Sequence, residues 1–141
     1  MFHFKLVSLT GTIFEGDVHE VILPTLEGEI GVLQDHMPLT SVATNGMIAV
    51  RKEAKDSDAK REYFAASGGL VNVQDNNLSV LVDEADHAEG IDEVEAQKAY
   101  DLAVKMKAEA KDQVSLEHAQ QIVDRSAVRL QVANIKKRHR R

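Results

Sequence analysis

The chain falls into two parts, because the spacing of its apolar residues changes near residue 90. At its start Phe2, Phe4 and Leu6 alternate with polar residues, and a period of two is typical of a strand with one buried face. Further β-rich runs occupy 19–23, 47–51, 63–66, 70–73 and 78–82. Turn-forming clusters separate them at 10–12, 15–17, 44–46, 67–69 and 74–77, and 53–60 reads as a polar hairpin tip. Short strands broken this often predict a sandwich or a barrel over residues 1–86.

Residues 91–138 carry a helical pattern instead. Glycine and proline are absent after Gly90. Asp92 is suited to cap the amino end of a helix, and Glu95, three residues on, fits a capping-box exchange. The first helix is then expected to bury a narrow stripe made of Ala99, Leu102, Ala103, Met106 and Ala110.

A second helix is predicted after a break in this pattern at 111–114. Ser115 is its expected N-cap. Its apolar face is expected to carry Leu116, Ala119, Val123, Leu130 and Ala133. Two helices joined by a short connection form an antiparallel hairpin, so the fold class is α+β.

The seam of this hairpin contains little apolar surface. Alanine dominates it, and Tyr100 is the single aromatic residue of the helical part. Apolar burial stabilises by ~25 cal/mol per Å², and isolated helices of this length are marginal in water. Two interpretations therefore stay open: a weakly held hairpin that detaches or extends, and a helical lid that stays docked.

Composition and charge narrow the classes of function. There is no cysteine, which excludes disulfides and cysteine-based zinc sites. The start of the chain does not resemble a signal peptide, and no run approaches the ~20 apolar residues of a membrane span, so work at a membrane would need a partner. Residues 124–141 hold seven Lys or Arg against one acid, a net of +6, so the rest carries −12 of the overall −6. An acidic body thus ends in a basic tail.

No pattern of a catalytic or metal site is present. The chain lacks the G-x-x-x-x-G-K-[ST] phosphate loop, the H-E-x-x-H zinc motif and the G-x-S-x-G nucleophile elbow, and its six histidines are scattered. Asp83, Glu84 and Asp86 form an acidic cluster between the two parts, which we interpret as a solvated linker. We therefore expect neither enzymatic activity nor a bound metal.

Four segments together carry a resemblance to a known family. Residues 27–33 read EGEIGVL and 36–40 read HMPLT, and then follow SGGLVNV at 67–73, VLVDEA at 80–85 and Ile91-Asp92. In order and spacing they are similar to the motifs of the epsilon subunit of bacterial F-type ATP synthases, called delta in mitochondria. The resemblance covers essentially all 141 residues.

The resemblance implies a flattened β-sandwich over 1–86 and a regulatory helical hairpin over 87–141. Such a subunit is a non-catalytic part of the central stalk. Its sandwich packs on the gamma subunit, rests on the ring of c subunits and rotates with them, which couples proton flow to ATP synthesis. In many members the hairpin extends into the alpha/beta catalytic head and blocks ATP hydrolysis. The expected location is peripheral, at the cytoplasmic face of the bacterial cell membrane, with membrane contact only through the c ring.

The resemblance also assigns contact residues in the first motif. The c-ring contact would involve Glu27, Glu29, Leu33 and His36. Carboxylates there would meet basic or polar groups of the c loops in a salt-sensitive contact. Without the resemblance, a strand-turn-strand with solvated glutamates is the simpler interpretation. Gln34-Asp35 stand where the family often has Pro-Gly, so the turn is expected to differ.

Some members of the family bind ATP in the folded hairpin, and this chain keeps half of their site. Asp92, Arg125 and Arg129 match that site, and the two arginines lie one helical turn apart. Glu95 stands where the motif has arginine, and its carboxylate would repel a triphosphate. We therefore expect weak ATP binding or none, no other cofactor, and a plain capping role for Asp92.

The basic end of the chain is open to three interpretations. By resemblance, an acidic segment of the beta subunit would be contacted by Arg125, Arg129, Lys136, Lys137 and Arg138 during inhibition. A solvated, frayed terminus is the simpler alternative. A nucleic-acid adaptor using 136–141 is the rival class, but the acidic body opposes it and the tail has no aromatic residue to stack on bases. A free-standing ATP sensor is disfavoured by Glu95.

Overall fold

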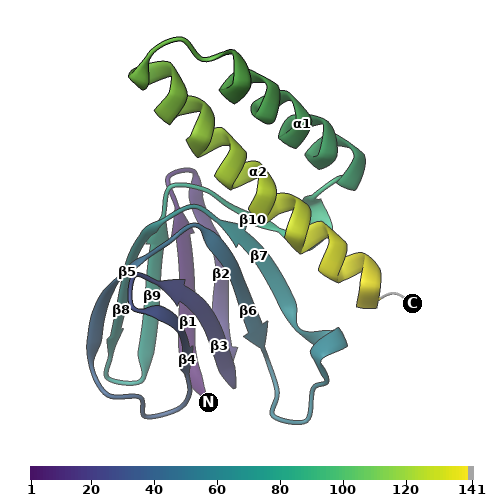
Figure 1. The fold of residues 1–141 in the computed structure, drawn as a ribbon. Coiled ribbons are helices and arrows are strands. Elements are labelled where there is room, and N and C mark those ends of the chain that lie inside the picture. Colours follow the sequence, from purple (N-terminus) through teal and green to yellow (C-terminus); the bar gives the residue numbers. More distant parts are fainter. Residues whose placement is uncertain (140–141) are drawn as a thin grey trace.

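The computed structural model describes residues 1–139, and its first part is one strongly curled sheet (Figure 1). Within that range ten strands are formed: β1 (Phe2–Ser8), β2 (Gly11–Val18), β3 (Glu20–Thr25), β4 (Gly28–Val32), β5 (Leu39–Ala43), β6 (Gly46–Arg51), β7 (Glu62–Ala66), β8 (Gly69–Gln74), β9 (Asn77–Val82) and β10 (Ala85–His87). They follow the order β10-β7-β6-β3-β5-β8-β9-β1-β2, with β4 paired to β3. All pairs are antiparallel except β1 with β9.

The sheet curls around one core and nearly closes. Phe4, Leu6 and Phe64 are fully buried inside it, as the alternation in the sequence requires. Phe14 of the edge strand β2 bridges the two ends of the strand order, because its ring lies 5.6 Å from that of Phe4 on β1 and 5.9 Å from that of Phe64 on β7. The predicted sandwich of short strands is confirmed, and so are its six predicted strands.

The turn predicted at 10–12 exists but lies at Leu9 and Thr10, because Gly11 already begins β2. The turn predicted at 15–17 is wrong, because these residues lie inside β2, which pairs with β1 along its length despite Gly16. Strand β4 was also missed, since Gly28 and Gly31 interrupt its apolar pattern. Both strands lie at the margins of the sheet, where pairing to a single neighbour and exposure to solvent weaken the alternation.

The helical part is the expected antiparallel hairpin. It consists of α1 (Glu93–Glu109) and α2 (Gln113–His139), preceded by the short helix η2 (Ala88–Gly90), while η1 (Asp58–Lys60) lies in the β6–β7 tip. Asp92 is confirmed as a cap, because its Oδ1 accepts from the amides of Val94 at 2.8 Å and Glu95 at 3.1 Å. No helix within residues 1–139 has the length and apolar character needed to cross a bilayer.

The predicted cap of the second helix is wrong by three residues. Ser115 lies inside the first turn of α2, and its amide donates to Oδ1 of Asp112 at 2.7 Å. Asp112 therefore caps the helix, and this backbone hydrogen bond lowers the pKa of its carboxyl. Asp112 immediately precedes α2, so its carboxylate accepts from a free amide of the first helical turn. Ser115 lies too far into the helix to serve as its cap.

The seam of the hairpin is narrower than the predicted stripe. Ala96, Ala103 and Ala119 are buried along it, whereas Leu102 is 61% exposed. Small residues let two helices approach closely, so the larger Leu102 lies one position off the seam and faces solvent. The prediction for Leu102 is therefore wrong.

The hairpin docks on the outer face of the sheet through α2 (Figure 1). Val132 and Ala133 of α2 are buried in a small cluster with Ala49, Tyr63 and Ala65 of β6 and β7. Helix α1 lies on the far side of α2, and the connection between the helices projects beyond the sheet (Figure 1).

Candidate functional site

A row of ion pairs runs beneath α2, and we call it the charge seam. Its cations come from α2 and its carboxylates from the segment 83–93 that joins the two parts. The pairs are Arg125 with Asp83 (3.8 Å) and Glu84 (3.9 Å), Arg129 with Asp86 (3.2 Å), Lys136 with Glu89 (2.6 Å) and Lys137 with Glu93 (3.6 Å). The two chain segments run in the same order along the seam.

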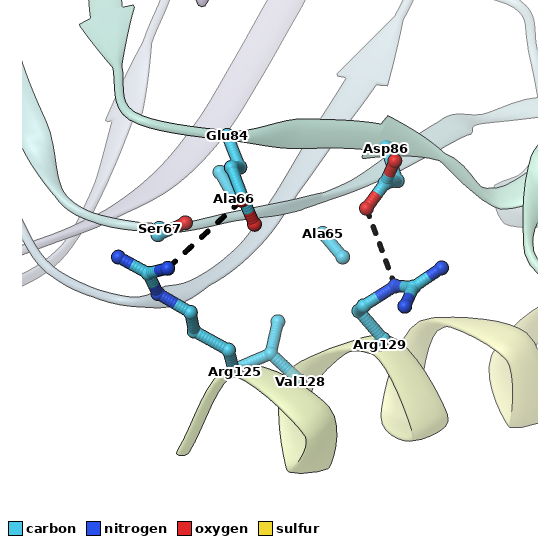
Figure 2. A pocket seen from close by; sticks show the side chains of 8 residues that line it. All are labelled: Ala65, Ala66, Ser67, Glu84, Asp86, Arg125, Val128 and Arg129. Carbon is cyan, nitrogen blue, oxygen red and sulfur yellow. Dashed lines mark ion pairs between the residues drawn. The ribbon is translucent and has the colours of Figure 1, made fainter. Parts of the chain in front are cut away.

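The charge seam corrects the interpretation of residues 83–86 as a solvated linker. Asp83, Glu84 and Asp86 each face an arginine of α2, and Figure 2 shows two of these ion pairs. The side chains of Arg125 and Arg129 remain 40% exposed, so their pairs are largely screened by water and contribute about 0–1 kcal/mol, although Nε of Arg129 is itself buried. The seam is a set of weak, salt-sensitive contacts rather than a buried lock.

The two arginines frame a very small cavity against the sheet (Figure 2). Its lining includes Ala65, Ser67 and Val128 besides the arginines and their carboxylate partners. The cavity volume is about 10 Å³, which is room for about one water molecule. In this docked arrangement Glu84 and Asp86 occupy the positions beside the guanidinium groups.

The three residues predicted to contact nucleotide do not form one site. Arg125 and Arg129 lie together, but Asp92 is not part of the lining of their cavity and uses Oδ1 as a helix cap. Among the five predicted inhibitory cations, four belong to the charge seam. Arg138 is exposed and forms no ion pair within residues 1–139, whereas Arg140 and Arg141 of the proposed nucleic-acid tail lie outside the described residues.

The predicted c-ring residues lie at the two ends of β4. Glu27 lies in the β3–β4 turn, and Glu29 is the second residue of β4. Leu33 and His36 belong to the turn after β4. The two turns are separated by the five residues of β4, about 16 Å at ~3.3 Å per residue. The predicted contact residues therefore form two groups, one near each end of β4.

The turn after β4 is held by a residue far away in the sequence. The amide of His36 donates to the carbonyl of Leu33 at 3.2 Å, and Asp35 has a φ of 60°. A positive φ at this third position is typical of a type II turn, in which glycine is preferred. Asn76 supports Asp35 by accepting from its amide at 3.0 Å. Nδ1 of His36 donates to the Met37 carbonyl at 2.7 Å, and its Nε2 forms no hydrogen bond with any part of residues 1–139.

Sequence reasoning missed an exposed apolar row on the outside of the sheet, over β5, β8 and β9 rather than over β6 and β7, where the hairpin docks. Val42 pairs with Leu70 across β5 and β8, and Leu70 pairs with Leu81 across β8 and β9. Their exposed fractions are 43%, 56% and 48%. The sequence did contain a sign of this row. Val42, Leu70 and Leu81 each lie at an outward position of the alternating pattern, where a strand that faces solvent would carry a polar residue.

Comparison with known proteins agrees with this architecture. Residues 1–88 match the family model for the beta-sandwich domain of the ATP synthase delta/epsilon chain. The chain belongs to the ATP synthase epsilon family. A chloroplastic epsilon chain from Zygnema circumcarinatum is 31% identical over 134 residues, spanning 95% of this chain and 97% of the relative. The epsilon chain of Caldanaerobacter subterraneus is also 31% identical, and 94% of each chain is covered.

Solved structures show the same fold for this epsilon-family chain. A chain in the cryo-EM structure of the Euglena gracilis mitochondrial ATP synthase, OSCP/F1/c-ring, matches with a TM-score of 0.77 at 23% identity, covering 93% of this chain and 79% of that one. A chain of the Tetrahymena thermophila mitochondrial ATP synthase central stalk and c-ring matches with a TM-score of 0.61 at 17% identity, covering 95% of both. The predicted family and the α+β fold are confirmed.

Proposed function

We propose that this chain is a non-catalytic rotor subunit in the central stalk of a proton-translocating F-type ATP synthase. It couples rotation of the c ring to ATP synthesis and restrains ATP hydrolysis through its hairpin. Its nearly full-length similarity to ATP synthase epsilon chains carries the proposal. The similar solved chains come from assemblies whose titles name F1, the central stalk and the c-ring.

The apolar row of Val42, Leu70 and Leu81 is the proposed contact with the gamma subunit. An exposed apolar row on a sheet favours association with another protein. The hairpin occupies the other outer face, on β6 and β7, so this row stays accessible while the hairpin is docked. Binding to gamma would then not require release of the hairpin.

The two turns around β4 are the proposed contacts with the c ring. Glu29, Leu33 and Met37 are exposed there, and Nε2 of His36 is available for a hydrogen bond. Contact with the ring would hold the subunit at the cytoplasmic face of the bacterial cell membrane.

The charge seam supports an inhibitory role with two exclusive states. Arg125, Arg129, Lys136 and Lys137 are paired with carboxylates of their own chain while the hairpin is docked. When the hairpin is released, the same cations become available to an acidic segment of the beta subunit. Because one cation cannot serve both partners fully, docking and inhibition compete.

Nucleotide is not proposed as the ligand that controls this competition. The cavity between the arginines has a volume of about 10 Å³, and Glu84 and Asp86 already neutralise them. Glu95 adds a carboxylate where the family motif has arginine. We expect calorimetry with the isolated chain to detect no tight ATP binding, and tight, specific binding would contradict this.

A reversible lock tests the inhibitory role. The chain has no cysteine, so Ala65→Cys and Val128→Cys, which line the same cavity, would form its only disulfide or bis-maleimide link. Locking the hairpin down should raise the rate of ATP hydrolysis by the assembled complex, and reducing the disulfide should restore inhibition. The two single-cysteine variants are the controls. Equal rates in the locked and reduced complexes would contradict inhibition by the hairpin.

A further inference from the structure

Glu27 is engaged within its own chain, although it lies on an exposed turn. Its Oε2 accepts from the hydroxyl of Ser41 in β5 at 2.7 Å. The amide of Glu27 donates to Oγ1 of Thr25 at 3.2 Å, and that hydroxyl donates to the Gly28 carbonyl at 2.7 Å. Oγ1 of Thr25 also lies 3.3 Å from Oε2 of Glu27. These contacts close a small network between the β3–β4 turn and β5.

The partners of Glu27 are well placed to fix the turn. Thr25 and Ser41 are only 5% and 8% exposed, so their hydroxyls belong to the rigid sheet rather than to the solvent. The hydrogen bond from Ser41, followed by that from the backbone of Glu27 itself, lowers the pKa of the Glu27 carboxyl. Gly28, the next residue, has a φ of 111°, a conformation in which a side chain would be strained. The Glu27 network and Gly28 together set the direction in which β4 leaves the turn.

Glu29 has the opposite surroundings. It lies on β4 opposite Pro24 of β3, its side chain is exposed, and it forms no hydrogen bond or ion pair within residues 1–139. Its carboxylate keeps its full capacity to accept hydrogen bonds from a partner. The carboxylate of Glu27 is therefore occupied by its own chain, whereas that of Glu29, only two residues away, can accept from a partner.

We infer that Glu27 is a positioning residue that fixes the β3–β4 turn by its hydrogen bond from Ser41, and that it leaves Glu29, already proposed as a c-ring contact, as the carboxylate of this turn that faces the ring. This division of roles rests on the proposed c-ring contact. Glu27 acts on the ring only through the geometry of the turn, so it needs an acceptor oxygen but no charge. Glu29 acts directly, so it needs its charge.

The isolated chain tests the positioning role without any partner. In Glu27→Gln the amide oxygen can still accept from Ser41, whereas Glu27→Ala and Ser41→Ala remove the link. Amide hydrogen exchange of Leu26, whose N–H donates to the Val42 carbonyl at 3.0 Å, reports on opening of the turn. We expect exchange to be on the order of tenfold faster in E27A and S41A, and unchanged in E27Q and in the matched control Glu29→Gln.

The second measurement is binding of the full chain to a purified complex of gamma and the c ring, at low and at physiological salt. We expect E27Q to bind as the wild type does. E29Q should bind about three- to tenfold more weakly at low salt and should lose most of its salt dependence.

The outcomes separate the two claims. If E27Q opens the turn as E27A does, or binds the ring as weakly as E29Q, Glu27 acts by charge and the inference is overturned. If E29Q binds with wild-type affinity and salt dependence, the recognition role of Glu29 is overturned. If the wild-type chain does not bind the complex at all, the proposed c-ring contact fails and takes the role of Glu29 with it, while hydrogen exchange still decides the role of Glu27.

Discussion

The sandwich and the hairpin of this epsilon-family chain are held by different forces. The sandwich buries large side chains such as Phe4, Leu6 and Phe64 completely. The hairpin buries mostly alanine along its seam and is tied to the sandwich by one small apolar cluster and a row of exposed ion pairs. We therefore expect the sandwich to be costly to disturb and the hairpin to be released without unfolding it. The proposed inhibitory role of the hairpin requires this contrast.

The largest effect is expected from the core of the sandwich. Phe64→Ala removes a fully buried ring packed against Phe14 and should cost about 3–5 kcal/mol of global stability. The matched change in the hairpin is Val132→Ala, at a position that is also fully buried. It should cost about 1–2 kcal/mol, at ~0.8 kcal/mol per lost methylene equivalent, and only in the docking of the hairpin. Chemical denaturation with region-resolved hydrogen exchange measures both.

The contrast between sandwich and hairpin would be contradicted if V132A lowered the protection of amides from hydrogen exchange in the β-strands as much as in α2. The two parts would then unfold as one cooperative unit, and release of an intact hairpin would be ruled out.

The next effect concerns binding rather than folding. Leu70→Glu places a charge in the centre of the exposed apolar row and should weaken binding to the gamma subunit by about 2 kcal/mol or more. Since Leu70 is more than half exposed, the melting temperature should change little. Ser79→Glu, an outward position on the neighbouring strand β9, is the control. Equal loss of affinity in both variants would mean that general charge, and not the apolar row, decides binding.

A smaller effect is expected in the charge seam. Arg129→Glu sets two carboxylates against each other beside Asp86 and should weaken docking of the hairpin by about 1 kcal/mol, mainly at low salt. The double variant R129E/D86R rebuilds the pair with reversed signs and should recover docking. Limited proteolysis of α2 at increasing salt measures the released fraction, with the exposed Lys105→Glu as control. Failure of the double variant to recover would show that the arginine acts through packing rather than charge.

Local patterns in the sequence were sufficient for much of this architecture. Alternation located the buried strands, and Asp92 located the start of α1, because both depend on residues within a few positions of each other. The family resemblance supplied the order of the two parts. By contrast, β2 and β4 were missed, because their glycines imitate turns when the neighbouring strand is unknown.

The candidate sites depended on contacts that sequence alone does not give. Lys136 and Glu89 are 47 positions apart, and nothing in their local sequence pairs them. The division between Glu27 and Glu29 is of the same kind, since it arises from Ser41 on another strand. Residue type predicted that these groups could take part in charged contacts, but only the fold decides which of them are already occupied.

The smallest effect is expected from a pH-sensitive contact on the surface of the sandwich. His3 on β1 lies 2.9 Å from Glu15 and 3.1 Å from Asp17, both on β2. Hydrogen bonds to Glu15 and then to Asp17 raise the pKa of His3, and the bond to His3 lowers the pKa of Glu15. Protonated His3 therefore contributes its full stabilisation of the folded state below its unfolded pKa of 6.5. This stabilisation is lost as the pH rises through the higher folded pKa.

The Glu15 side of the contact limits the same window from below. Because folding lowers the pKa of Glu15, its ionised carboxylate stabilises the folded state at pH values above the unfolded pKa of 4.5. This stabilisation is lost as the pH falls through the folded pKa. Stability of the wild type relative to His3→Gln should thus be greatest between about pH 4.5 and 6.5 and should decline on both sides, which thermal melts over this range would measure. The groups are exposed, so the difference should be small and should shrink with salt. A pH-independent difference between the two proteins would mean that His3 supports β2 by packing alone. The contrast between a sandwich held mainly by its apolar core and a hairpin docked partly by charge would then be sharper.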